Sequence, residues 1–256
     1  MKNWAFLCSN EVPKHLGDAK PPIYQAVLTA VGQIGVDFAL LPDHSVKTFY
    51  SRLTPPPPQR LLCASQWERR FDCSFNWDSI WSNIYGGLST NWESDIAWRI
   101  AHAVVKTRAY LKSWCRLAVT DRCAGCGEKE TIPHTFCACR LVSPVWSWVS
   151  KLINKLYTTP ILLTNPLILL RHGLPRGKQF HFSNELCSFL IKLTLNELWA
   201  ARNLGTLESK RPTFQTIISK IKARIRHRIR AAFNFSPRPD FIKSWAHRDA
   251  LCSYTN

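Results

Sequence analysis

Four residues in the middle of the chain have the types and the spacing of a metal site. Cys123 and Cys126 form a pair with a two-residue gap, His134 follows eight residues later, and Cys139 lies five residues beyond it. The pattern C-x2-C-x7-H-x4-C supplies the four ligands of a closed tetrahedral zinc site. A catalytic zinc needs one position that is open to water or substrate, so four protein ligands predict one structural Zn2+ ion.

Spacing alone leaves other interpretations of this cluster open. The thiols could be ordinary cysteines near a lone histidine, or the CxxC pair could be a redox motif, which expects a strand–helix context that this stretch does not show. Cys137 could replace Cys139 as the fourth ligand, although the longer gap to Cys139 lets the chain turn back more easily. Three thiolates and one imidazole leave a net charge of −1 on a zinc site. Nearby cations that would offset this charge, and that could also meet phosphate, are Arg122, Lys129 and Arg140.

An excess of positive charge favours a polyanionic partner. The 256 residues include 34 Lys and Arg against 17 Asp and Glu, a formal net charge of +17. Residues 201–256 are the most basic part, with 12 Lys and Arg against three Asp and Glu. Such an excess attracts nucleic acid first and an anionic membrane surface second. No apolar run is long enough to span a bilayer, so we expect no membrane partner.

The last predicted helix, from Pro212 to Phe233, has an apolar stripe and cations on its other faces. The stripe recurs every fourth residue, which predicts a helix docked by its isoleucines: Ile217, Ile221, Ile225 and Ile229. We expect the cations to contact the phosphates of RNA or DNA, because few acids lie near them in the sequence. Solvated cations on an ordinary surface helix, or membrane-surface binding, are the alternatives. The cations are Lys220, Lys222, Arg224, Arg226, Arg228 and Arg230.

Apolar residues at helical spacing predict a mainly α protein, with a small zinc-binding helical subdomain followed by a basic helical region. A helix capped by Ser94 is predicted from Asp95 to Val105, after one or two helical turns that end at Gly86 and Gly87. The other expected helices cover 23–34, 45–53, 107–115, 145–156 and 184–202, the last of them ended by Gly205. Residues 157–182 are expected to form a loop. We predict three regions: an N-terminal connector with a proline-rich linker at 1–65, the zinc-binding domain at 66–150, and the basic helical region at 151–256.

Several motifs around the cysteine cluster occur together in a known order. They are D-I-A-W-R-I-A-H at 95–102, T-R-A-Y-L at 107–111, Trp114, the four ligands, and Val145–Trp146. This stretch resembles the zinc-binding domain that follows the reverse transcriptase in non-LTR (LINE-type) retrotransposon polyproteins. The resemblance extends more weakly over about residues 45–256. It implies Cys139 as the fourth ligand, element RNA or target DNA as the partner, and an intracellular, nuclear location.

The chain departs from this family's pattern in two ways. Lys106 stands where the family usually has proline. The chain also has no Tyr/Phe-x-Asp-Asp and no Asp-x-Asp motif, and polymerase chemistry needs clustered carboxylates that hold two metal ions. The endonuclease that precedes the polymerase in many such elements is missing too. We therefore expect a fragment of such a polyprotein that is not an enzyme.

Two functions are compatible with these features. In the first, the chain binds nucleic acid: Arg122, Arg140 and the cations of residues 220–230 contact phosphates, and Phe136, expected to be exposed between two ligands, stacks on an unpaired base. In the second, the chain is a zinc-stabilised structural or protein-interaction module, and its charge serves only solubility.

Overall fold

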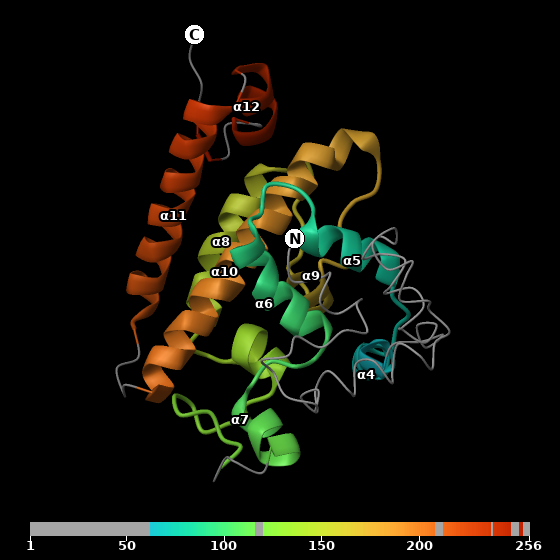
Figure 1. Cartoon of the computed structure of the whole chain (residues 1–256), viewed down its shortest axis with the longest axis vertical. Helices are drawn as coiled ribbons and strands as arrows, with labels where there is room; N and C mark the ends of the chain where they lie inside the picture. Colours follow the sequence, from blue (N-terminus) through green and yellow to red (C-terminus); the bar gives the residue numbers. More distant parts are fainter. Residues whose placement is uncertain (1–61, 116–119, 208–211, 237, 247–250, 253–256) are drawn as a thin grey trace, which may run out of the picture. The chain divides into compact units, whose positions relative to one another are not determined.

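The structure is a computed structural model that describes residues 62–115, 120–207, 212–236, 238–246 and 251–252. Within these ranges the chain is mainly helical and forms no strand, as the spacing of its apolar residues predicts (Figure 1). The helices predicted at 23–34 and 45–53, and the proline-rich linker, lie outside the described residues.

Helix α10 (His181–Leu207) is the central element of the fold. Every residue from 186 to 198 is buried, and a helix that is buried on all sides has to be surrounded by other elements. The helices around it come from the sequence before residue 150 and from the sequence after it, and they share one hydrophobic core. The elements that contact α10 include α6 (Asn91–Ala101), the π-helical turn η4 (His134–Ala138), α8 (Ser143–Lys155), α11 (Phe214–Phe235) and α12 (Arg238–Trp245).

The remaining elements are shorter. Helix α7 (Arg108–Tyr110) continues into η3 (Leu111–Cys115) and confirms the helix predicted at 107–115. Helix α9 (Asn165–Leu170) lies where a loop was expected, and it begins at Thr164, whose hydroxyl accepts a hydrogen bond from the backbone N–H of Leu167. The others are α4 (Leu62–Phe71), α5 (Trp77–Tyr85) and the 3-10 turn η5 (Lys178–Phe180).

Two predicted helix boundaries are wrong for local reasons. Helix α6 is capped by Thr90, whose backbone N–H donates to the Glu93 carboxylate at 2.6 Å, whereas Ser94 is buried inside the helix. A Thr with Glu three residues later forms a capping box, which satisfies more backbone groups than Ser94 could alone. Helix α10 runs through Gly205 to Leu207. Gly205 does not adopt the left-handed conformation with which a glycine commonly ends a helix.

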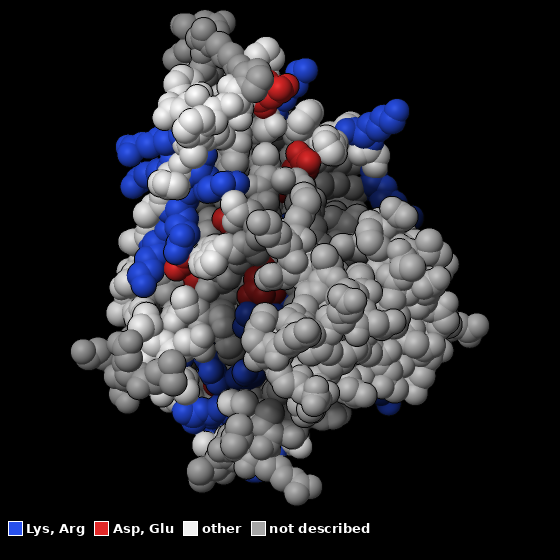
Figure 2. Space-filling view, viewed as in Figure 1, with Lys and Arg blue, Asp and Glu red and all other residues white. Residues whose placement is uncertain are grey.

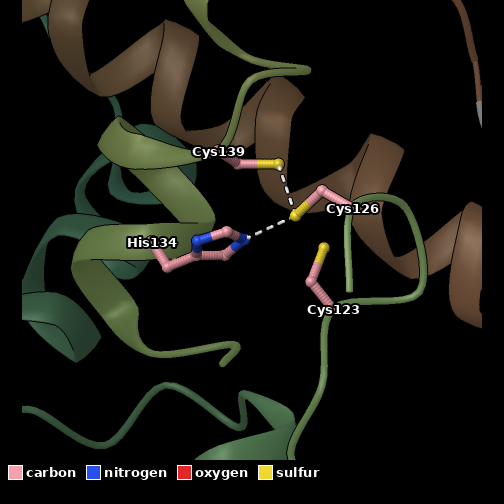
Figure 3. Close-up of side chains that lie close together, drawn as sticks. All are labelled: Cys123, Cys126, His134 and Cys139. Atoms are coloured by element: carbon pink, nitrogen blue, oxygen red, sulfur yellow. Dashed lines mark hydrogen bonds between the residues drawn. The ribbon is translucent and has the colours of Figure 1, made fainter. Parts of the chain in front are cut away.

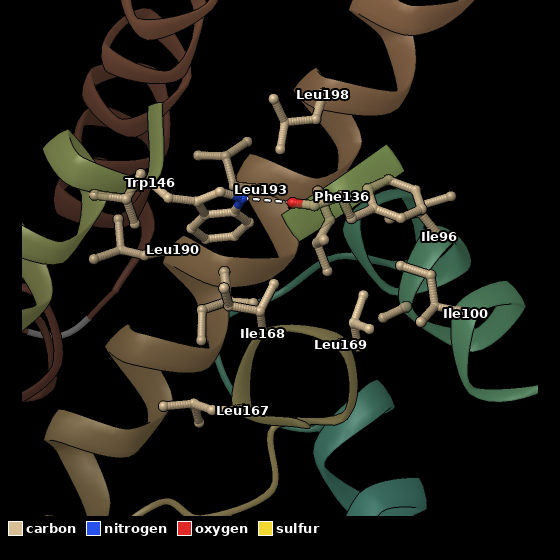
Figure 4. Packing of buried hydrophobic residues seen from close by; sticks show 14 of the residues in the cluster. Ile96, Ile100, Phe136, Trp146, Leu167, Ile168, Leu169, Leu190, Leu193 and Leu198 are labelled. Carbon is tan, nitrogen blue, oxygen red and sulfur yellow. Dashed lines mark hydrogen bonds between the residues drawn. The ribbon is translucent and has the colours of Figure 1, made fainter. Parts of the chain in front are cut away.

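The core joins the cysteine-rich segment to the central helix (Figure 4). Phe136 of η4 and Trp146 of α8 are buried among leucines of α9 and α10. The indole N–H of Trp146 donates to the backbone carbonyl of Phe136 at 2.6 Å. This hydrogen bond satisfies a carbonyl that lies away from water, and it ties η4 to α8.

Helix α11 docks on this core by its isoleucine stripe, as predicted. Thr213 caps the helix by accepting from the backbone N–H of Thr216. Ile217, Ile221 and Ile225 are buried, Ile229 is half-buried, and Phe233, which continues the same spacing, is exposed. The cation-bearing faces stay largely exposed. Although α10 and α11 are long, no helix among the described residues is both long and apolar enough to cross a membrane.

Candidate metal centre and basic helix

A tight turn places the first two cysteines side by side. Arg122 and Lys129 form an isolated antiparallel bridge, and between them the backbone N–H of Cys123 donates to the Glu128 carbonyl at 2.6 Å. Gly127 closes the turn, because its backbone N–H donates a hydrogen bond to the Cys123 carbonyl at 2.9 Å. Its φ of 79° lies in the left-handed region, which glycine adopts without strain. The turn therefore holds both thiols without support from a larger sheet.

The other two members of the cluster come from η4 and the residue that follows it. The backbone N–H of His134 donates to the Thr131 hydroxyl, which starts the turn. The N–H of Cys139 returns to the His134 carbonyl at 2.9 Å, and Cys139 then adopts an extended conformation. The π-helical turn thus places the side chains of His134 and Cys139 on the same side of the chain.

The four donor atoms of Cys123, Cys126, His134 and Cys139 all lie within 4.8 Å of one another (Figure 3). The Cys126 sulfur is 3.2 Å from Nε2 of His134 and 3.7 Å from the Cys139 sulfur. A tetrahedral site with metal–sulfur bonds of about 2.3 Å, as for zinc, has sulfur atoms roughly 3.8 Å apart. The group can therefore hold a metal ion with little rearrangement.

The thiols of the cluster stay protonated unless a cation lies beside them. Burial, together with the neighbouring Cys123 and Cys126 thiols, raises the pKa of Cys139 to about 11. Three thiols so close together can all ionise only beside a positive charge, and a bound metal ion supplies that charge. Cys123, His134 and Cys139 are buried, so protein surrounds most of the site.

Cys137 lies outside the group of donor atoms. Its side chain is half-buried, and burial raises the pKa of its thiol to about 12. The Cys139 sulfur, by contrast, points toward the Cys126 sulfur at 3.7 Å (Figure 3). The geometry thus favours Cys139 over Cys137 as the fourth donor.

Glu130, which the sequence did not single out, anchors the metal-site loop. Its carboxylate is 2% exposed and accepts from the backbone N–H of Arg108 at 2.9 Å. It also accepts from Nε of Arg202 at 3.1 Å and forms an ion pair with Nη2 at 2.5 Å. This one carboxylate joins the loop to α7 and to the central helix. A separation of 72 residues hides the Arg202 pair from any local pattern.

The expectation that Phe136 is exposed is wrong. Its side chain is fully buried against the core, with the ring of Trp199 at 6.1 Å between centroids. The reason is that the segment between His134 and Cys139 is a helical turn packed on α8, α9 and α10, not an open loop. Phe136 therefore supports the metal site from inside and cannot stack on a base in this conformation.

The two arginines beside the cysteine cluster are both exposed. Arg122 lies on the bridge next to Cys123, and its backbone carbonyl accepts from Nη1 of Arg108 at 3.2 Å. Arg140 directly follows Cys139. Neither guanidinium forms an ion pair within the described residues. Both side chains are free to meet an anion.

The cations of α11 gather along one side of the molecule (Figure 2). Four of them are exposed and form no ion pair within the part of the chain that the structure describes: Lys220, Lys222, Arg226 and Arg230. The Lys222 ammonium lies 5.5 Å from the Trp148 ring centroid, which holds it close to the surface of α8.

Two other arginines of α11 have structural partners. Arg224 pairs with the buried carboxylate of Glu197 at 2.5 Å and lies over the Trp92 ring at 4.3 Å. Nη2 of Arg228 donates to the Leu88 carbonyl at 2.6 Å. The expectation that acids would be too few to pair with these cations is wrong for Arg224, because folding brings Glu197 to it from 27 residues away.

Comparison with known proteins gives a distant similarity. No family model matches the chain, and no solved structure matches it. The chain is 25% identical over 177 residues to a Xenopus laevis protein described as "Transposon TX1 uncharacterized 149 kDa protein". The similar region covers 68% of this chain but only 13% of the length of that relative. Over most of its length, then, the chain is distantly similar to a part of a transposon protein.

Proposed function

We propose that this chain is a zinc-stabilised nucleic-acid-binding module of a LINE-type retrotransposon protein. The motifs at 95–102 and 107–111, the ligand spacing and the similarity to a transposon protein support the origin. In this proposal the module has no polymerase or endonuclease activity of its own. It acts in the nucleus, where element RNA or target DNA is its partner.

Zinc is the metal that this site suits best. Three thiolates and one imidazole are a common donor set for structural zinc, and four protein ligands leave no position for a reacting water. In its bound state zinc supplies a cross-link between the turn at 123–127 and η4. That cross-link holds the loop 128–133 in place and sets the position of the neighbouring cations.

The observation that carries the nucleic-acid proposal is the exposed basic face of α11. Its isoleucines are buried, so the helix presents Lys220, Lys222, Arg226 and Arg230 from a fixed position. A row of cations that have no acidic partners matches the regular charge of a phosphate backbone. Arg224 belongs instead to the contacts that fix α11 on the protein body.

A salt titration tests this proposal. The zinc-loaded chain is titrated with a single-stranded RNA or DNA oligonucleotide at several salt concentrations. Each phosphate contact contributes about 0.7 to the slope of log affinity against log salt. Arg226→Gln with Arg230→Gln should therefore lower the slope by about 1.4. Arg176→Gln with Lys178→Gln, which removes two exposed cations between α9 and α10, should leave it unchanged.

The opposite outcome would favour the second function. If the folded, zinc-loaded wild type does not bind oligonucleotides even at low salt, the nucleic-acid proposal is rejected. The chain would then be a zinc-stabilised structural or protein-interaction module.

A further inference from the structure

A basic pocket lies between α4 and the metal-site loop, which comprises residues 127–133. None of the residues that line it belongs to α11. Its volume is about 520 Å³. One wall comes from α4, with Arg69 and Arg70, a second from α7 and η3, with Tyr110 and Ser113, and a third from residues 129–133 of the metal-site loop. Trp67 also lines the pocket, and its indole N–H donates to the Ala101 carbonyl at 3.0 Å.

The charge of this pocket has one sign. Arg69, Arg70 and Lys129 line it, and none of the described residues that line it is Asp or Glu. Within the described ranges none of these three cations forms an ion pair. The nearby Asp121 is paired with Lys112 at 3.5 Å, so it is only partly available to Lys129. Three cations that converge on one concave space hold a strong positive potential there.

Zinc and Glu130 both fix the third wall. Lys129 and Pro133 mark the ends of a segment that lies between the ligands Cys126 and His134. Glu130, the second residue of this segment, is held by the backbone N–H of Arg108 and by Arg202. A metal bound at this centre would therefore help to hold the segment that carries Lys129 beside α4.

We propose that this pocket binds the phosphate backbone of the same nucleic-acid strand that the chain engages, as a second contact site besides α11. The proposal rests on the proposed function. Two guanidinium groups and one ammonium offer the forked and point-like donors that phosphate oxygens accept. The hydroxyl group of Ser113 adds a neutral donor at the wall. In this inference the zinc centre contributes to binding by shaping the pocket.

Lysine footprinting of the zinc-loaded chain tests this assignment at the residue itself. An amine-acylating reagent is applied with and without a bound single-stranded oligonucleotide, and each lysine is read by mass spectrometry. We expect several-fold protection of Lys129. Lys178, which is also exposed, is the matched control and should react equally in both samples. Equal modification of Lys129 with and without oligonucleotide would overturn the assignment. The same protection by inorganic phosphate alone would show a site for free phosphate and overturn the assignment to a strand.

A pair of charge variants separates this inference from the proposed function. Arg70→Gln with Lys129→Gln should lower the salt slope by about 1.4, like the α11 pair Arg226→Gln with Arg230→Gln. All these side chains are exposed, and zinc content checks the fold of each variant. A pocket variant that keeps the wild-type slope, beside an α11 variant that loses it, overturns the pocket and leaves the proposed function standing. Failure of the wild type to bind any oligonucleotide rejects both.

Discussion

Breaking the buried ion pair between Glu130 and Arg202 should be one of the most destabilising single changes in the protein. Arg202→Met keeps the length of the side chain but removes the guanidinium. The Glu130 carboxylate, 2% exposed, then retains the Arg108 N–H as its remaining side-chain contact. Removing one partner of a buried pair costs about 3–5 kcal/mol, because a charge stays buried without compensation. At about 2–4 °C per kcal/mol for a unit of this size, the melting temperature should fall by roughly 6–20 °C.

Urea unfolding of the zinc-loaded chain, followed by circular dichroism, measures this loss. The control is Arg99→Met, which breaks the exposed pair with Asp95 and should cost no more than about 0.5 kcal/mol. Replacing Glu130 by Met in the Arg202→Met background should restore much of the stability, since no charge is then left buried. A cost of Arg202→Met below about 1 kcal/mol would refute the anchoring role of Glu130.

Two further changes test the core. Burial, with Arg171 nearby, lowers the pKa of Lys192 to about 7. Between pH 7 and 10 the unfolded chain therefore binds more protons than the folded chain does. The free energy of unfolding should rise over this range by up to about 1.4 kcal/mol per pH unit. Lys192→Met should flatten that rise. If the free energy of unfolding changes equally between pH 7 and pH 9 in the wild type and in Lys192→Met, the lowered pKa of the buried amine is contradicted. Trp146→Phe leaves the Phe136 carbonyl without its donor and should cost about 1–3 kcal/mol in the same unfolding assay; an unchanged free energy of unfolding would show that water replaces the indole.

The sequence predicted those parts of the protein that depend on local spacing. The donors Cys123, Cys126, His134 and Cys139 lie within 17 residues, and short turns alone can bring them together. The stripe of α11 follows from one side chain in every fourth position, so its buried face could be predicted without knowledge of what it packs against.

What the sequence could not predict depends on contacts between distant residues. Nothing near Phe136 in the sequence shows that α10 and its Trp199 lie against the metal site. The same holds for Glu130 and Glu197, which look like ordinary surface acids until folding brings Arg202 and Arg224 to them. Charges that are counted along the sequence therefore overestimate the cations that remain available to nucleic acid.

The zinc content of the purified chain and its variants tests the proposed metal centre most directly. We predict one zinc per chain in the wild type and in Cys137→Ser, and loss of zinc with unfolding of the surrounding loop in Cys126→Ser and Cys139→Ser. A wild type without zinc would contradict the centre itself. Full zinc in Cys139→Ser, together with loss in Cys137→Ser, would contradict the ligand set that the structure favours.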